Sequence, residues 1–177
     1  MAEPNVLLSS NALHKCLLRV AHEISERNEA SHEVIIVGVQ RGGVHLAARL
    51  AVLLKNIWQH DVPHGSLDVS MHRDDLDRQP APQVMPTHLP FDLTGRTIVL
   101  VDDVLFSGRT VRAALDELSD FGRPRRVQLA VLVDRGHREL PIKADFVGKN
   151  APTSLHEHIE VQWREDGGGD VVYLRKK

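Results

Sequence analysis

The pattern of apolar and polar positions along this chain predicts helices and strands that follow one another in alternation. Apolar residues return every three or four positions over residues 12–28, which is typical of a helix with one buried face. Short apolar runs, typical of strands buried on both faces, lie at 34–39, 96–101 and 127–133. Apolar positions at helical spacing predict two further helices after the first two of these runs: Val44, Ala47, Ala51 and Leu54, then Val111, Ala114, Leu115 and Leu118. Strands alternating with helices predict a doubly wound α/β fold with a parallel sheet.

Shorter segments complete this prediction. Leu67, Val69 and Met71 alternate with polar residues and predict a strand with one polar face. The stretch from 72 to 90 is rich in Asp, Arg, Gln and Pro without periodicity, and such a long unpatterned loop predicts a flexible lid. The remaining strands are predicted at 144–147, 158–163 and 170–174. We expect the terminal segments to form a small cap over the carboxyl edge of the sheet, and the whole chain, 1–177, to be one domain.

Composition places the chain among ordinary globular proteins. Its 177 residues are 42% hydrophobic and 26% charged, and the formal net charge of -2 argues against non-specific coating of nucleic acid. We see no signal peptide and no apolar run of membrane-spanning length, and the single cysteine, Cys16, excludes an internal disulfide. We therefore expect a cytoplasmic protein that does not bind membranes. Among eleven histidines, His156 and His158 are closely spaced, but scattered surface histidines explain them better than a metal site.

The most informative segment joins the 96–101 strand to the helix that follows it. Asp102 and Asp103 come where the strand ends, and a loop, 107–110, opens the helix. Ligands of open α/β sheets bind at the carboxyl ends of the strands. The hydroxyl groups and glycine of this loop, with the unpaired N–H groups of the helix, suit a phosphate. The paired acids suit sugar hydroxyls or hydrated magnesium, so the segment predicts a site for a phosphorylated ribose.

Alternatives to this interpretation fit less well. The acids could merely cap the helix, although one Asp would suffice for that. The chain contains neither G-x-x-x-x-G-K-[ST] nor G-x-G-x-x-G, so a P-loop nucleotidase and a dinucleotide-binding fold lack their usual support.

Three further loops are expected near the same edge of the sheet. Gln40, Arg41 and Gly42 follow the first strand and suit a pyrophosphate group. Arg73, at the start of the lid, would bring a cation to that pyrophosphate. The loop after the 127–133 strand, which begins with Asp134, would lie beside the acceptor of the ribose. A plain surface turn or a solvated charge cluster is the alternative for each loop.

The segment Asp102–Thr110 resembles the 5-phosphoribosyl-1-pyrophosphate (PRPP) loop of type I phosphoribosyltransferases. In that family the two acids hold the ribose hydroxyls, and the residues after them bind the 5-phosphate. The resemblance implies catalytic roles for Asp102, Asp103 and Arg73, pyrophosphate binding by Gln40, Arg41 and Gly42, and magnesium carried mainly by PRPP near the two acids. The PRPP-binding residues that it implies are Val99, Leu100, Val101, Asp102, Asp103, Val104, Leu105, Phe106, Ser107, Gly108, Arg109, Thr110 and Val111.

Longer runs resemble the pyrimidine operon regulator family, PyrR, within that class. These runs are HRDDL at 72–76, VDDVLFSGRTVRAAL at 101–115 and LVDRGHRELPIKADFVGKN at 132–150. Members carry uracil phosphoribosyltransferase activity, and in many bacteria they bind pyrimidine-operon mRNA when uridine nucleotides are abundant, which attenuates transcription. The resemblance implies an enzyme that converts uracil and PRPP to UMP and pyrophosphate, with uracil at Asp134 and Arg135. It also implies a homo-oligomer, dimer or tetramer, that responds to UMP or UTP.

The same resemblance implies RNA contacts at Arg19, His22, Arg27, Arg138, Lys143 and Lys149. The chain departs from the family at Leu18, where a Thr is common, and at Lys143, where an Arg is usual and a bidentate fork is lost. Arg41-Gly42-Gly43 also takes the place of the family's frequent Thr-Arg-Gly. Two rival functions stay open: a regulator with vestigial enzyme activity, and a phosphoribosyltransferase for another base, such as a purine.

Overall fold

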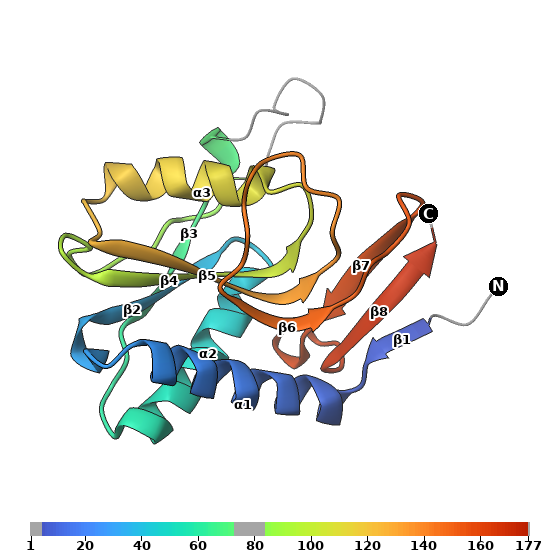
Figure 1. Ribbon diagram of the computed structural model, residues 1–177, viewed down its shortest axis with the longest axis horizontal. Helices are drawn as coiled ribbons and strands as arrows, with labels where there is room; N and C mark the ends of the chain where they lie inside the picture. Colours follow the sequence, from blue (N-terminus) through green and yellow to red (C-terminus); the bar gives the residue numbers. More distant parts are fainter. Residues whose placement is uncertain (1–4, 73–83, 177) are drawn as a thin grey trace.

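The computed structural model describes residues 5–72 and 84–176 and contains two sheets (Figure 1). The larger sheet is parallel, in the order β3-β2-β4-β5-β6. Its strands are β2 (Val34–Val39), β3 (His64–Leu67), β4 (Thr97–Leu105), β5 (Arg126–Asp134) and β6 (Phe146–Asn150). The three α-helices of the described residues are α1 (Ser10–Arg27), α2 (Gly43–Trp58) and α3 (Arg109–Asp120). The doubly wound α/β fold is therefore confirmed.

The core forms two layers because successive side chains of a strand point to opposite faces of the sheet. Val34 and Ile36 of β2 pack with α1 and α2, whereas Ile35 and Val37 pack on the face that α3 covers. Figure 1 shows α3 on one side of the sheet and α1 with α2 on the other. Each fully buried aliphatic side chain contributes about 1.5–3 kcal/mol, so a sheet covered on both faces supplies a rigid support for its loops.

The second sheet is antiparallel and is the expected cap. It has the order β1-β8-β7, with β1 (Asn5–Leu8), β7 (Glu157–Gln162) and β8 (Val171–Lys176). The strand β1 has no counterpart in the prediction, because a segment of four residues is too short to show a period. The first and last strands of the described residues therefore both lie in the cap, beside the larger sheet in Figure 1.

The predicted strand through Leu67, Val69 and Met71 is wrong in position. The strand β3 ends at Leu67, and residues 70–72 form a 3-10 turn in which the Met71 side chain is exposed. The cause is Asp68, whose Oδ1 accepts hydrogen bonds from Ser70 N (3.2 Å) and Ser70 Oγ (2.6 Å). Such an Asx turn competes with the strand ladder and ends it.

Two other expectations concern the site. The paired acids were expected just after a strand that ends at 101, but β4 continues to Leu105, because β5 is as long and pairs with it up to Leu105↔Asp134. Of the predicted lid, 73–83 lies outside the described residues. Within 84–90, His88 makes a backbone bridge with Ser66 of β3.

Candidate active site

Three of the four loops predicted at the carboxyl edge of the larger sheet meet there, and the fourth, which begins at Arg73, lies outside the described residues. The segment 102–110 is joined to the loop 134–142, since Arg135 N donates to Leu105 O (3.0 Å) and Glu139 N donates to Ser107 O (3.0 Å). The loop 40–43 approaches from the other side. A Cβ atom on Gly42 would lie 2.1 Å from Asp103 Oδ2, so the loop backbone packs directly on that carboxylate. The topology of the sheet thus brings together residues that are 30 to 61 positions apart in the sequence.

The paired acids lie on the part of β4 that extends beyond β2. The pairing of β2 with β4 ends at Gly38↔Val101, so Asp102 and Asp103 face the loop 40–43 on that side. The Asp103 carboxylate accepts a hydrogen bond from Val104 N (2.7 Å), and Asp102 Oδ1 accepts one from Asp103 N (2.9 Å). Burial raises the pKa of Asp103. A partly buried carboxylate at the edge of a sheet fits sugar hydroxyls or a metal ion supplied by a ligand.

The N-termini of α2 and α3 point toward this region. In the described residues neither helix has an acidic residue in its first turn, and Arg109 N at the start of α3 donates a long hydrogen bond to Ser107 Oγ (3.4 Å). Helix N-termini attract anions, so the acids are flanked by two candidate anion sites.

The loop that starts α3 requires its glycine. Gly108 has φ +93°, a conformation that residues with a Cβ rarely adopt, and a Cβ there would lie 3.3 Å from Ile142. The positive φ turns the chain sharply from β4 into α3. Ser107, Gly108 and Thr110 therefore lie around the first N–H groups of the helix, and phosphate binding by this loop stays a prediction.

The side chains of the 134–142 loop are used mainly to hold the loop itself. Arg138 forms an ion pair with Asp134 and donates to Phe106 O (2.7 Å) and Ile142 O (2.9 Å). Glu139 forms an ion pair with Arg109 at 2.6 Å, which ties this loop to the start of α3. Nothing in the sequence pattern indicated these roles. Arg138 was also predicted to contact RNA, and its guanidinium would have to give up some of these contacts within the protein to do so.

Arg135, predicted to bind uracil, lies with its side chain 7% exposed and turned toward the segment that leads into β7. Its guanidinium donates to Thr153 Oγ1 (2.8 Å), Ser154 O (3.0 Å) and Glu157 O (2.8 Å), and stacks 4.2 Å from the Phe106 ring centroid. Burial lowers the pKa of this guanidinium without discharging it. Arg135 thus joins the cap to the loop beside the paired acids. Direct contact with a base stays a prediction.

The remaining predicted residues divide between two regions. Arg19 and Arg27 lie on α1: Arg19 donates to Gly148 O (2.5 Å) on the edge strand β6, and Arg27 pairs with Asp145 at 3.1 Å. His22 is exposed on α1 and Lys149 is on β6, so four of these residues lie on α1 or β6. The exposed Lys143 lies in the loop before β6, and Arg138 lies in the 134–142 loop. Arg73 lies outside the described residues.

Comparison with known proteins identifies the family. Residues 9–166 match the phosphoribosyl transferase domain. The chain is 55% identical over 177 residues to the bifunctional protein PyrR of Chloroflexus aurantiacus, covering 99% of this chain and 97% of that protein. The chain belongs to the PyrR family. PyrR of Streptomyces coelicolor is 54% identical over 176 residues, covering 99% of this chain and 91% of that protein.

Solved structures support the fold of this family member. A hypoxanthine-guanine phosphoribosyltransferase from Bacillus anthracis superposes with a TM-score of 0.75 and 20% identity, covering 98% of both chains. The hypoxanthine phosphoribosyltransferase of Trypanosoma cruzi gives a TM-score of 0.73 and 17% identity, covering 98% of this chain and 97% of the other. At such low identity these structures show the type I phosphoribosyltransferase fold and nothing about the base. Within the described residues, no helix is both long and apolar enough to cross a membrane.

Proposed function

We propose that this PyrR family member transfers the phosphoribosyl group of PRPP to uracil, giving UMP and pyrophosphate, and also regulates pyrimidine genes by binding RNA. One observation carries the enzymatic half: two helix N-termini, neither with an acidic residue in its first turn, flank a pair of carboxylates. PRPP has the matching order of groups, with a phosphate at one end, ribose hydroxyls in the middle and a pyrophosphate at the other end. The 55% identity to a bifunctional PyrR supports both halves of the proposal.

The reaction breaks the bond between the ribose and the pyrophosphate through a transition state with cationic sugar character. Asp102 and Asp103 would accept hydrogen bonds from the ribose hydroxyls and place negative charge beside the developing cation. The N-terminus of α3 would hold the 5-phosphate, and the 40–43 loop with the N-terminus of α2 would stabilise the leaving pyrophosphate. Fixing both ends of the substrate supplies much of the effective molarity toward uracil.

Magnesium fits this donor set, because carboxylate oxygens are its preferred protein ligands. Asp102 and Asp103 are the residues that would hold the ion together with PRPP, and the ion would neutralise charge on the pyrophosphate. Burial raises the pKa of Asp103 and so disfavours its ionised form. The positive charge of the ion would favour the ionised carboxylate that the site needs. The acids themselves bind and orient the sugar.

We place uracil beside the 134–138 loop, which the hydrogen bond from Arg135 N to Leu105 O holds against the PRPP segment. Both side chains that were predicted to bind uracil are engaged within the protein. Recognition of the base would therefore fall mainly to backbone groups of this loop. Such recognition distinguishes bases by their pattern of donors and acceptors.

A panel of bases tests the enzymatic half. Purified protein with PRPP and magnesium is incubated with uracil, hypoxanthine, guanine or orotate, and pyrophosphate release is measured. We expect turnover with uracil. Turnover with a purine and none with uracil would assign the chain to another specificity, and no turnover with any base would support the vestigial alternative.

The RNA-binding half is placed on the side formed by α1 and β6, where Arg19, Arg27 and Lys149 lie. Since Arg19 and Arg27 also pair with Glu23 and Asp145, binding RNA phosphates would require these ion pairs to rearrange. A gel-shift titration with a pyrimidine-operon leader hairpin, with and without UMP, measures this activity. A scrambled hairpin is the control, and equal weak binding to both would argue against regulation. We also propose a cytoplasmic homo-oligomer, which sedimentation of the purified protein would test.

A further inference from the structure

The helix α2 carries the proposed pyrophosphate loop at its N-terminus, so the position of the helix determines where the loop lies. The loop has little freedom toward the sheet: a Cβ on Gly42 would lie 2.1 Å from Asp103 Oδ2, and one on Gly43 would lie 2.1 Å from Val101 O. The buried face of α2, with Leu46 and Leu50, packs in the core. A shift of the first two turns of α2 by a few tenths of an ångström would displace the N–H groups meant for the pyrophosphate.

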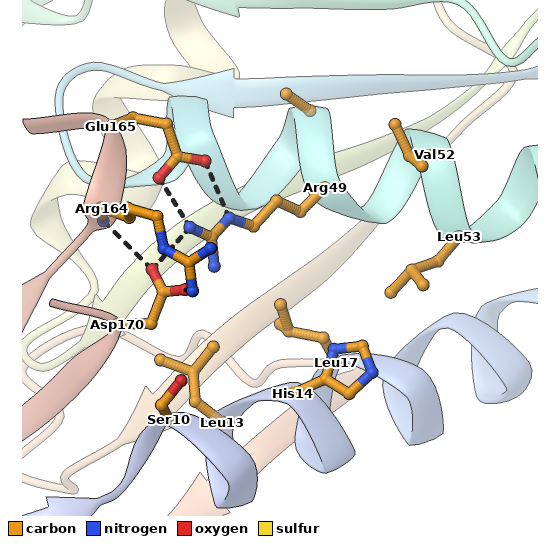
Figure 2. A pocket seen from close by; sticks show the side chains of 11 residues that line it. Ser10, Leu13, His14, Leu17, Arg49, Val52, Leu53, Arg164, Glu165 and Asp170 are labelled. Atoms are coloured by element: carbon orange, nitrogen blue, oxygen red, sulfur yellow. Dashed lines mark hydrogen bonds and ion pairs between the residues drawn. The ribbon is translucent and has the colours of Figure 1, made fainter.

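The opposite face of these two turns contacts the cap through ion pairs. His45 and Arg49 are one turn apart and both face the segment 164–170, which links β7 to β8 and which we call the cap turn. His45 Nε2 lies 2.9 Å from Asp166 Oδ1. Arg49 donates through Nε and Nη2 to both oxygens of Glu165 (2.9 and 2.6 Å) and through Nη2 to Asp170 Oδ1 (2.6 Å) (Figure 2).

The cap turn is itself well anchored. The Arg49 guanidinium carbon lies 4.7 Å from the centroid of the Trp163 ring, and Trp163 is 2% exposed. Asp170 Oδ1 also accepts a hydrogen bond from Arg164 N at 3.1 Å. Hydrogen bonds from Arg49 lower the pKa of both Glu165 and Asp170, so both carboxylates stay charged at neutral pH. The ion pairs therefore connect α2 to a fixed point of the cap.

Packing alone does not fix this side of α2. A hollow with a volume of about 480 Å³ lies between α1 and α2 beside the ion pairs. Figure 2 shows the side chains that line it. Leu13 and Leu17 of α1 line it across from Val52 and Leu53 of α2, and Arg49, Glu165 and Asp170 close one end. Because open space flanks the helix here, the fork between Arg49 and the two carboxylates is the directional contact that holds it.

We propose that Arg49, assisted by His45, is a positioning residue that holds the pyrophosphate loop in register with Asp103 through the cap turn. The inference rests on the proposed phosphoribosyltransferase function. A planar fork that binds two carboxylates fixes both the distance and the direction of α2, whereas a single ammonium group fixes the distance alone. Losing the fork should therefore weaken binding of PRPP and pyrophosphate rather than binding of the base.

The test compares Arg49→Met and Arg49→Lys with Lys55→Met. Lys55 is on the same helix at its other end and forms an exposed ion pair with Asp61 at 2.6 Å, which makes it a matched control. For each variant, kcat and the KM for PRPP and for uracil are measured, with the KM for pyrophosphate in the reverse reaction. We expect Arg49→Met to raise the KM for PRPP and pyrophosphate about fivefold or more and that for uracil less than twofold. Arg49→Lys should recover part of the loss, and Lys55→Met should behave as wild type.

Equal changes in the KM for PRPP and uracil, or a PRPP effect as large in Lys55→Met, would overturn the proposal, since a loss of general stability acts on both substrates. If Arg49→Met does not fold, Glu165→Gln replaces it and is judged by the same KM comparison. Calorimetric titration of magnesium–PRPP into wild type and variants needs no turnover. A wild type that binds PRPP without converting uracil would refute the proposed uracil activity, and the weakened PRPP binding of Arg49→Met would still decide the role of Arg49.

Discussion

Replacing Asp103 by Asn should lower activity and raise stability at the same time. The Asn side chain keeps the size of Asp and an oxygen that can accept the hydrogen bond from Val104 N, now 2.7 Å long. It removes the charge beside the developing cation and one strong acceptor for a ribose hydroxyl. Hydrogen bonds to charged groups are worth about 1.5–3 kcal/mol, so kcat/KM should fall by about ten- to 150-fold.

The gain in stability follows from linkage. Burial raises the pKa of Asp103 in the folded protein, so the protonated form stabilises the fold, and this stabilisation is lost as the pH rises through the folded pKa. The Asn side chain cannot ionise, so the Asp103→Asn variant does not lose stability as the pH rises through this range. Each kcal/mol gained would raise Tm by about 2–4 °C in a protein of this size. The difference in Tm between Asp103→Asn and wild type should be largest near pH 8 and should shrink as the pH approaches about 4.

The assay combines uracil-dependent pyrophosphate release with thermal unfolding from pH 4 to pH 8. Asp116→Asn is the matched control, because Asp116 is an exposed acid on α3 whose ion pair with Arg112 is 3.3 Å long. This control should change neither measurement appreciably. Wild-type activity in Asp103→Asn would remove the residue from the mechanism, and a lower Tm at pH 8 would refute the reasoning about its buried charge.

Further variants test other parts of the structure. Gly42→Ala should reduce kcat/KM by about a hundredfold or more, because the added Cβ would clash with the Asp103 carboxylate. Gly169→Ala is the control, since a Cβ there would meet nothing within 4 Å, and similar losses in both variants would argue against close packing of Gly42 on Asp103. Arg135→Met removes three hydrogen bonds and should lower Tm by about 5 °C or more, measured by calorimetry; an unchanged Tm would mean that the cap is held elsewhere. The pKa of Asp170 is lowered in the folded protein, so its stabilisation is complete above the unfolded pKa of about 4 and is lost as the pH falls through the lower folded pKa. Asp170→Asn should therefore make the free energy of unfolding depend less on pH below about 4, and an unchanged pH dependence would contradict this. Arg27→Ala should weaken binding to the leader hairpin and reduce its salt dependence while uracil transfer persists, and undiminished binding in a gel shift would exclude it from the RNA surface.

Local patterns predicted most of the larger sheet. The runs at 34–39, 96–101 and 127–133 became β2, β4 and β5 because uninterrupted aliphatic residues of this length are stable where helices cover both faces of a sheet. The predictions failed where a local side-chain hydrogen bond or the pairing with a neighbouring strand decided where a strand ends. Asp68 ended β3 by accepting two local hydrogen bonds, and the length of β5 carried β4 onward to Leu105.

The sequence by itself determined the chemistry of the candidate site: the paired acids, the phosphate loop after them and the family to which the chain belongs. These features are local, since a strand, a turn and a helix start can all be recognised within about fifteen residues. The tertiary structure alone decided which groups have other partners. It placed the Gly42 backbone against Asp103, turned Arg135 and Arg138 inward and linked Arg49 to the cap turn. The physical reason is that the strand order and the cap bring together residues far apart in the sequence, such as Arg49 and Glu165, which are 116 positions apart, and no local pattern records that proximity.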